Sequence, residues 1–315
     1  MTNDSRRLDK RKKTDWLPLM LLLPSFILLA GITVYPFLSG LYNSFFDYSL
    51  KKPTVNFIGF KNYVDILKEG KFMASLGFTI LFTVIDLVVA MVLGFITALL
   101  LQQKFAGKNL LKAIMLIPWI LPQVVTGFIF NLMIAQDMGI LNRLMALAGL
   151  VPFDFSWFSS PKTAMAAVIM ANSWRGFPFI ALMVYSKMQA VSKELMEAAS
   201  LDGANAFQKF LHVVFPEIQQ VLMTCAFLVF LWTFNCFDII KVMTNGGPLE
   251  KTTTMSLLLQ REAFSYLKIG RACAMAVLMF ICLMVIIGLL FLVKNLITKG
   301  VASIEERRQS KKISD

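Results

Sequence analysis

The sequence has little charge, a single histidine and no closely paired cysteines. Only 16% of its 315 residues are charged, whereas 57% are hydrophobic, and the mean hydropathy is +0.68. A soluble domain is typically about 25% charged. A chain this apolar could not cover its surface with polar groups in water, which argues against soluble enzymes, disordered proteins and fibrous proteins. The class that remains is a protein whose solvent is largely lipid.

Two chemical signatures are also missing. The four cysteines fall in or at the edge of apolar runs and none forms a C-x-x-C pair, so neither a disulfide framework nor a zinc site is indicated. The chain lacks the G-x-x-x-x-G-K-[ST] phosphate loop, so we do not expect it to hydrolyse ATP itself. The net charge of +12 reflects basic chain ends that suit anionic headgroups, and it requires no nucleic acid.

Long hydrophobic runs are what the sequence has most of. A helix needs about 20 apolar residues to cross a bilayer, and six stretches qualify. Prolines within several of them would kink the helices, and a membrane tolerates such kinks only in a packed bundle. We therefore expect an all-α membrane protein with six transmembrane helices, at about residues 16–38, 72–101, 113–136, 163–186, 218–237 and 272–293.

Six helices place both chain ends on one side of the membrane, and the positive-inside rule selects that side. Lys and Arg are more frequent in the segments on the side of the chain ends, and a basic cluster directly precedes the first helix. We expect the N-terminus, residues 1–15, and the tail, residues 294–315, to be cytoplasmic. Residues 16–293 then form the transmembrane domain, and the loop over residues 187–217 is also cytoplasmic.

That inner loop carries the most informative pattern in the chain. Ser192 is a suitable N-cap for a helix over residues 193–201, and Gly203 follows where a left-handed residue would end it. Asn205 can cap a second short helix, which we expect Pro216 to end. Its apolar residues recur at helical spacing: Phe207, Phe210, Leu211 and Val214. A helix–turn–helix with one acid and several small residues fits docking to a partner.

The same loop resembles a known signature. Glu197-Ala198-Ala199, then Gly203, then Val213-Val214-Phe215-Pro216 follow the spacing E-A-A-x3-G-x9-I-x-L-P. This "EAA" signature belongs to permease subunits of binding-protein-dependent ABC importers. Val213 and Phe215 depart from it, each replacing one apolar residue by another. We call residues 187–217 the EAA loop.

Two further stretches resemble the carbohydrate subfamily of these permeases, to which the maltose and glycerol-3-phosphate systems belong. Residues 237–248 match F-D-x-I-x-x-x-T-x-G-G-P, and residues 57–63 match F-x-G-x-x-N-Y. The resemblance implies the type I ABC importer permease fold. It also implies ATP-driven import of a sugar or related polyol across the cytoplasmic (inner) membrane of a prokaryote.

Partners follow from the same resemblance. An ATPase dimer would hold ATP and Mg²⁺, so we expect no cofactor on this chain; a second permease subunit would complete a heterodimer, and an extracytoplasmic solute-binding protein would deliver the carbohydrate. Glu197 would pair with a basic ATPase residue, while Phe207 and Phe210 would hold the loop on its own bundle. The coupling residues implied are Glu197, Ala198, Ala199, Asp202, Gly203, Phe207 and Pro216. Those implied to face the binding protein, unless they form only an ordinary turn, are Gly246, Gly247 and Pro248.

Sugars are bound by aromatic faces and polar groups, which suggests where the substrate path lies. The candidates within or beside the predicted helices are Asn172, Trp174, Arg175, Trp232, Asn235 and Asp238. Intramembrane charges usually face the interior, yet Arg175 and Asp238 could simply pair with each other or with the partner subunit. Trp232 could be ordinary packing, and Trp174 could brace the kink at Pro178. We interpret Asp86 as a packing or interfacial acid, and His212 as a surface residue.

Three alternatives are less consistent with the sequence. A secondary transporter would carry paired ionisable residues at mid-membrane and internal repeats, and it would leave the EAA loop unexplained. A membrane-embedded enzyme would need a nucleophile, a metal cluster or paired acids within the membrane. A permease for amino acids, metals or polyamines remains an alternative cargo class, against which the Gly-Gly-Pro run argues.

Overall fold

The computed structural model describes the backbone of residues 17–314 and the side chains of residues 20–292. Within these residues the regular structure is helical, apart from an isolated antiparallel bridge between Phe46 and Phe57. The all-α fold predicted from the hydrophobic runs is confirmed. The expected N-terminal segment, residues 1–15, and the side chains of the expected basic tail, residues 294–315, lie outside the described residues.

Five helical runs are long and apolar enough to cross a membrane, and one bent helix pair raises this number to six. The five are Met20–Asn43, Lys71–Gln102, Pro161–Gln189, Ala206–Phe234 and Ile269–Leu292. The bent pair is Lys108–Ile120 with Gln123–Met133. These helices fall in the same parts of the chain as the six predicted runs. Most boundaries differ by a few residues, but the fifth helical run begins at Ala206, well before the predicted residue 218.

The chain divides into two compact units, which we describe separately. Unit 1 comprises Met1–Tyr63 and Leu267–Asp315, and unit 2 comprises Val64–Tyr266. The helices of unit 1 are α1 (Leu17–Leu29), the π-helical turn η1 (Ala30–Val34), α2 (Tyr35–Asn43) and α14 (Ile269–Ser314). Helix α3 (Lys61–Lys68) begins in unit 1 and continues into unit 2. Helices α2 and α14 pack together, and the rings of Phe37 and Phe280 lie 5.6 Å apart.

The F-x-G-x-x-N-Y stretch has a structural role within unit 1. The Asn62 side-chain amide donates hydrogen bonds to the carbonyl oxygens of Ser44 and Phe46, at 2.9 and 3.0 Å. The Tyr63 hydroxyl lies 2.6 Å from that of Ser44. These bonds satisfy backbone acceptors just beyond the end of α2, so this motif fixes the turn that leaves the helix.

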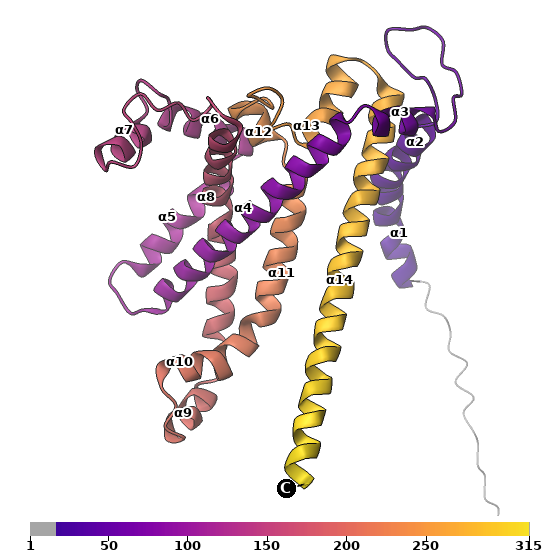
Figure 1. Ribbon diagram of the computed structural model, residues 1–315. Coiled ribbons are helices and arrows are strands. Elements are labelled where there is room, and N and C mark those ends of the chain that lie inside the picture. Colours follow the sequence, from indigo (N-terminus) through magenta and orange to yellow (C-terminus); the bar gives the residue numbers. More distant parts are fainter. Residues whose placement is uncertain (1–16, 315) are drawn as a thin grey trace, which may run out of the picture. The chain divides into compact units, whose positions relative to one another are not determined.

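Unit 2 is built around two long helices, α4 (Lys71–Gln102) and α8 (Pro161–Gln189), with α11 (Phe215–Phe234) packed against both. Figure 1 shows α4 running obliquely across α8 and α11 in the centre of the unit. Its remaining helices are α5 (Lys108–Ile120), α6 (Gln123–Met133), α7 (Ile140–Leu147), α9 (Lys193–Leu201), α10 (Ala206–Lys209), α12 (Asp238–Met243) and α13 (Met255–Gln260). Two π-helical turns join these elements, η2 (Phe210–Val214) and η3 (Arg261–Ser265).

The third predicted span, residues 113–136, is not one straight helix. Helices α5 and α6 meet at an angle of 101°. Leu121 is extended, with ψ 137°, and Pro122 follows it as the N-cap of α6. A proline disfavours helical geometry in the residue before it, which explains the break at Leu121. Pro118 lies inside α5 without ending it.

The prediction that Pro216 ends the second helix of the EAA loop is wrong. Helical structure runs without a break from Ala206 through η2 into α11, as far as Phe234. Pro216 stands at the start of α11, directly after the π-helical turn. A π-helical turn changes the hydrogen-bond register, so the helix can accept a residue that has no N–H to donate.

Small residues allow α4 and α8 to approach closely. Ala90, Gly94 and Ala98 recur every four residues along one face of α4, and both alanines are fully buried. A methyl group built on Gly94 would lie 2.6 Å from the Cβ of Ile180 on α8. Lipid tails are as apolar as the helix surfaces, so the hydrophobic effect does not drive helices together within a membrane. Close packing of small residues is therefore a main source of helix association there.

We predict that Gly94→Ala destabilises unit 2, because the added methyl group must push α4 and α8 apart. The expected loss in free energy of unfolding is about 1–3 kcal/mol, measured by thermal or denaturant unfolding of the detergent-solubilised protein. Gly77→Ala is the matched control in the same helix, since nothing lies within 4 Å of a Cβ there. Equal stabilities of the two variants would contradict the proposed close packing.

Candidate functional site

A buried carboxylate joins the three central helices of unit 2. Asp86 on α4 is 1% exposed. One of its oxygens accepts hydrogen bonds from the Asn172 amide, at 2.7 Å, and from the Thr233 hydroxyl, at 2.9 Å. The other accepts from the Ser173 hydroxyl, at 2.7 Å. We call these four residues the Asp86 cluster; it links α4 with α8 and α11.

The interpretation of Asp86 as a packing acid is confirmed. Asn172, predicted as a substrate-path residue, belongs to the same cluster and is itself buried. Its side-chain nitrogen is already directed at Asp86 and lies 3.4 Å from the Thr233 hydroxyl. The sequence offered no sign of this partnership, because Asn172 and Thr233 are far from Asp86 in the chain.

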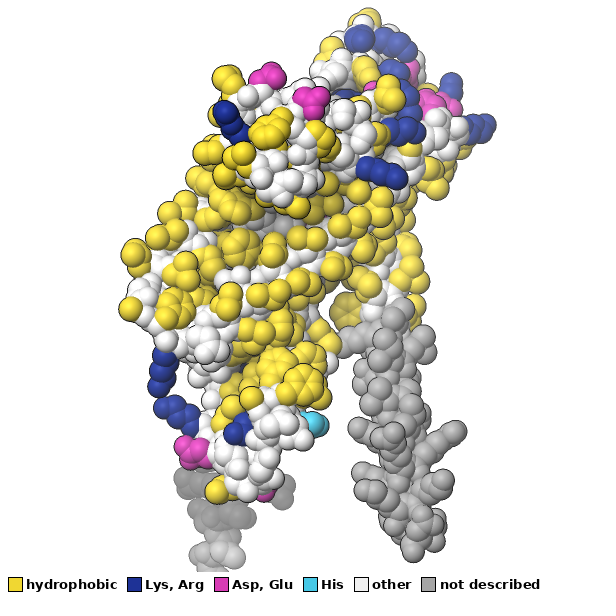
Figure 2. Space-filling view, turned by 60° about the vertical axis from the view of Figure 1, so that its left-hand side comes forward, with side chains coloured by type: hydrophobic (Ala, Val, Ile, Leu, Met, Phe, Trp, Pro, Cys, Tyr) yellow, Lys and Arg dark blue, Asp and Glu magenta, His cyan; other side chains and the backbone are white. Residues whose placement is uncertain are grey.

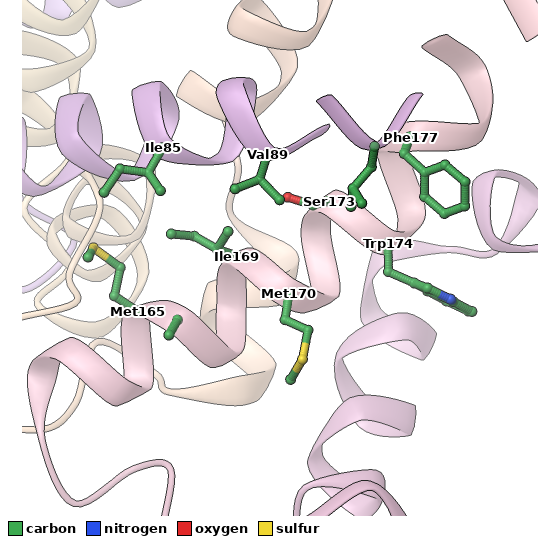
Figure 3. A pocket seen from close by; sticks show the side chains of 10 residues that line it. Ile85, Val89, Met165, Ile169, Met170, Ser173, Trp174 and Phe177 are labelled. Atoms are coloured by element: carbon green, nitrogen blue, oxygen red, sulfur yellow. The ribbon is translucent and has the colours of Figure 1, made fainter. Parts of the chain in front are cut away.

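An apolar groove of about 590 Å³ lies between α4 and α8. Figure 3 shows Ile85 and Val89 of α4 facing Ile169 of α8 across it. Apart from Ser173, whose hydroxyl is donated to Asp86, the lining side chains are hydrophobic. A sugar has many hydroxyl groups that need hydrogen-bond partners, so this groove suits hydrocarbon rather than a carbohydrate. Among the predicted path residues, Trp174 lines it.

The charged path candidates are not paired directly. Arg175 and Asp238 interact only at longer range, without a salt bridge, and the Arg175 Nε has no hydrogen-bond partner among the described residues. Asp238 lies in the first turn of α12, where an acid stabilises the helix N-terminus. The Asn235 amide donates to the Leu231 carbonyl, at 2.9 Å, and so caps the end of α11.

Aromatic rings gather on an adjoining part of unit 2. Phe179 of α8 packs edge-on against Trp232 of α11, with ring centroids 5.1 Å apart, and stacks on Trp119 of α5 at 5.7 Å. Trp232 is 43% exposed and Trp119 38% exposed. We call these three residues the aromatic surface. Of its members only Trp232 was predicted; the spacing of seven from Asn172 to Phe179 could have indicated a shared helix face.

Trp174 does not belong to the aromatic surface. Its ring packs edge-on against Phe130 of α6, with centroids 5.4 Å apart. The structure therefore distributes five of the six predicted path residues among a buried cluster, the apolar groove, helix ends and the aromatic surface. The sixth, Arg175, lies in the middle of α8.

The EAA loop has the predicted helix–turn–helix conformation. The Ser192 hydroxyl accepts a hydrogen bond from the Glu194 amide at the start of α9. Gly203 has a φ of +77°, the left-handed conformation expected beyond the helix end. Asn205 and Gln208 form a reciprocal capping box that starts α10, with hydrogen bonds of 2.8 and 2.9 Å.

Most of the predicted coupling residues are exposed. Glu197, Ala198, Asp202, Gly203 and Pro216 all face solvent, and Ala199 is half-buried. Leu201 beside them is 90% exposed. Such an exposed turn with apolar and acidic groups has the features of a docking surface.

Of the two phenylalanines expected to hold the EAA loop on its own bundle, Phe210 does so and Phe207 does not. Phe210 packs on the bundle, with its ring 6.0 Å from that of Phe95 on α4. Phe207, one helical turn earlier, is 71% exposed and so does not hold the loop in place. The short α10 directs only the residues near η2 toward α4.

The Gly-Gly-Pro turn is fixed by hydrogen bonds from its own unit. Arg261 donates to the Asn245 carbonyl at 2.6 Å and forms a salt bridge with Glu250 at 3.2 Å. Gly246 has a φ of +83°, and a Cβ there would lie 2.5 Å from the Thr253 hydroxyl. The turn therefore has a structural reason for its glycine, whatever it contacts outside the chain.

Comparison with known proteins identifies the family. The family model described as "Binding-protein-dependent transport system inner membrane component" matches residues 90–310, which is more than half of the chain. The chain belongs to this family. The resemblance of the EAA loop is thus confirmed, and this permease is an inner membrane component of a binding-protein-dependent transport system.

Individual relatives agree with the family. The permease is 33% identical over 218 residues to the trehalose/maltose transport system permease protein MalF of Thermococcus litoralis, covering 69% of this chain and 72% of that protein. It is 32% identical over 285 residues to the sulfoquinovosyl glycerol transport system permease protein SmoG of Agrobacterium fabrum, covering 87% and 92%. A solved bacterial ABC transporter for alginate import has a similar chain, with TM-score 0.73, 20% identity and coverage of 88% and 93%. The fold is the type I importer permease fold that the sequence predicts.

We predict that Thr233→Val destabilises the permease, because it removes one donor to the buried Asp86 carboxylate. The change keeps the side-chain shape, so the loss reports the hydrogen bond rather than a cavity. We expect the free energy of unfolding to fall by about 1–2 kcal/mol, measured by unfolding in detergent.

Thr83→Val provides the control for this measurement. Thr83 is equally buried, on the same helix as Asp86, but its hydroxyl has no hydrogen-bond partner in the part of the chain that the structure describes. Replacing it should leave stability unchanged or raise it. If Thr233→Val behaved like Thr83→Val, the Asp86 cluster would not be a significant source of stability.

Proposed function

We propose that this permease moves a sugar or a related polyol into the cell by alternating access. The support is the cargo named for its relatives: trehalose and maltose for MalF, and sulfoquinovosyl glycerol for SmoG. The alginate importer adds a carbohydrate system with the same fold. A non-sugar cargo has no comparable support among these proteins.

The observation that carries the coupling proposal is the exposed EAA loop, which joins the long helices α8 and α11. A separate ATPase dimer would receive α9 in a surface cleft and would hold ATP and Mg²⁺, so that this chain needs no cofactor. Glu197 would pair with a basic residue of the ATPase, and Ala198, Ala199 and Gly203 would allow a close fit. Closure of the ATPase dimer on ATP would then move the EAA loop and the helices joined to it.

The orientation and the other partners complete the proposal. The chain ends and the EAA loop would be cytoplasmic, as the distribution of Lys and Arg indicates. The solute-binding protein would dock on the opposite face, where Gly246, Gly247 and Pro248 would contribute. A second solved structure of similar fold is the bacterial alginate ABC transporter in complex with its periplasmic protein, which holds an alginate pentasaccharide. A second permease subunit would complete the translocation path as a heterodimer.

Within this chain the aromatic surface is the best candidate for contact with sugar. Trp232 and Trp119 are partly exposed, and pyranose rings stack on aromatic rings because the C–H groups of the sugar are apolar. Asn235, exposed three residues after Trp232, would supply a polar group beside them. Asn172, by contrast, would act by holding the Asp86 carboxylate.

We predict that Glu197→Lys prevents coupling to the ATPase, because it reverses the charge at the centre of the docking surface. Binding of the purified ATPase should weaken by about tenfold or more, and substrate-stimulated ATP hydrolysis should fall with it. Glu194→Lys makes the same charge change on the same helix but outside the EAA pattern, and should have a smaller effect. Unchanged binding and hydrolysis in Glu197→Lys would exclude the docking role.

We predict that the cognate solute-binding protein binds carbohydrates. A thermal-shift screen against sugars, sugar phosphates and polyols should raise its melting temperature for at least one of them, and uptake of that compound should require this permease. Amino acids and polyamines form the control panel. A shift with a control compound and with no carbohydrate would reject the proposed cargo.

A further inference from the structure

Two lysine side chains of α5 converge on one buried ring of α8. The Lys108 Nζ lies 4.8 Å from the centre of the Tyr185 ring, and the Lys112 Nζ lies 5.3 Å from it. Tyr185 is 8% exposed, and its hydroxyl accepts a hydrogen bond from the Gln189 amide at 2.7 Å. Both lysines are half-buried, which is unusual for side chains that normally extend into solvent.

Nothing in the described part of the chain neutralises these two charges. Neither amine has a carboxylate within salt-bridge distance, in contrast to the nearby Lys187, which pairs with Glu217 at 2.9 Å. The segment from Lys104 to Lys112 contains three lysines and no acid. A cation–π contact is worth only about 0.5–1 kcal/mol at an exposed site. Two like charges held over one ring therefore form a site that favours an anion.

The surroundings indicate what kind of anion fits. Leu111 and Ile114, which follow Lys108 on the surface of α5, are 45% and 53% exposed. The turn between α4 and α5 lies toward the same end of unit 2 as α9 and α10, and Figure 2 shows basic side chains at that end beside a broad hydrophobic surface. Lysines at the border of an apolar helix surface coincide with the headgroup level of a bilayer.

We propose that Lys108 and Lys112, supported by Tyr185, bind the phosphate of an anionic phospholipid whose acyl chains lie along the apolar surface of α5. The two ammonium groups would share the phosphate, and Leu111 and Ile114 would contact the hydrocarbon. A free phosphate ion would contact the two ammonium groups but would make no use of Leu111 and Ile114. The two lysines lie outside the EAA loop and the aromatic surface, although Gln189 of the loop contacts Tyr185. The site includes none of the proposed coupling or cargo residues, so it does not depend on either proposal.

The test compares lipid preference in the full-length purified protein. The double variant K108Q/K112Q and the wild type are placed in nanodiscs of phosphatidylcholine with or without phosphatidylglycerol, and bound lipid is measured by native mass spectrometry after release. We expect the preference of wild type for phosphatidylglycerol to fall by about tenfold in the double variant. K162Q/K251Q, which removes the same charge from two exposed lysines elsewhere in unit 2, should keep the preference.

A charge-retaining variant shows whether an effect comes from the lost charge or from misfolding caused by substituting both lysines. K108R/K112R should keep the phosphatidylglycerol preference within about twofold, because two cations remain over Tyr185. Equal preference in wild type and K108Q/K112Q would overturn the proposal. So would inorganic phosphate that displaced the lipid from the lysines as effectively as phosphatidylglycerol does. A loss of ATPase coupling with unchanged lipid preference would also overturn it and would assign the lysines to the ATPase.

Discussion

The buried Asp86 carboxylate is the interaction on which the arrangement of unit 2 depends. A carboxylate in an apolar interior must have its lone pairs satisfied, because no water compensates for a missing donor. Three donors from two other helices meet this need, so α4, α8 and α11 can pack in only a few registers that keep all of them in place. The small residues around Gly94 then bring α4 and α8 into contact along their length. The hydrogen bonds to Asp86 fix the relative positions of the helices, and the close packing around Gly94 provides much of the attraction between them.

The sequence predicted local features well. Hydrophobic runs identify the long helices, because the length of an apolar run is itself the physical requirement for crossing lipid. Ser192, Gly203 and Asn205 act on their immediate neighbours, so their capping roles could be read directly from the EAA loop. The break at Leu121 and the uninterrupted helix at Pro216 show the limit of this reading. Both involve a proline. The residue before Pro122 is extended and the helix breaks there, whereas a π-helical turn precedes Pro216 and the helix continues.

The site was harder to predict because it is assembled from distant parts of the chain. Asp86 meets Thr233 across 147 residues, and no spacing rule connects them. The aromatic surface combines residues from three helices, and of these residues only Trp232 was predicted from the sequence. Phe207 and Phe210 share an apolar stripe, yet only Phe210 reaches the bundle, since periodicity identifies a face of a helix and not how far the neighbouring helix extends.

The continuous helix from Ala206 to Phe234 has a mechanical consequence. At about 1.5 Å per residue it forms a stiff rod that begins in the EAA loop and ends one residue beyond Thr233. The helical structure is continuous between its two ends, so a displacement applied at the loop would be transmitted along the helix toward the Asp86 carboxylate. The π-helical turn near its base is where the hydrogen-bond register of this helix changes, so a twist applied at the loop would first meet that turn.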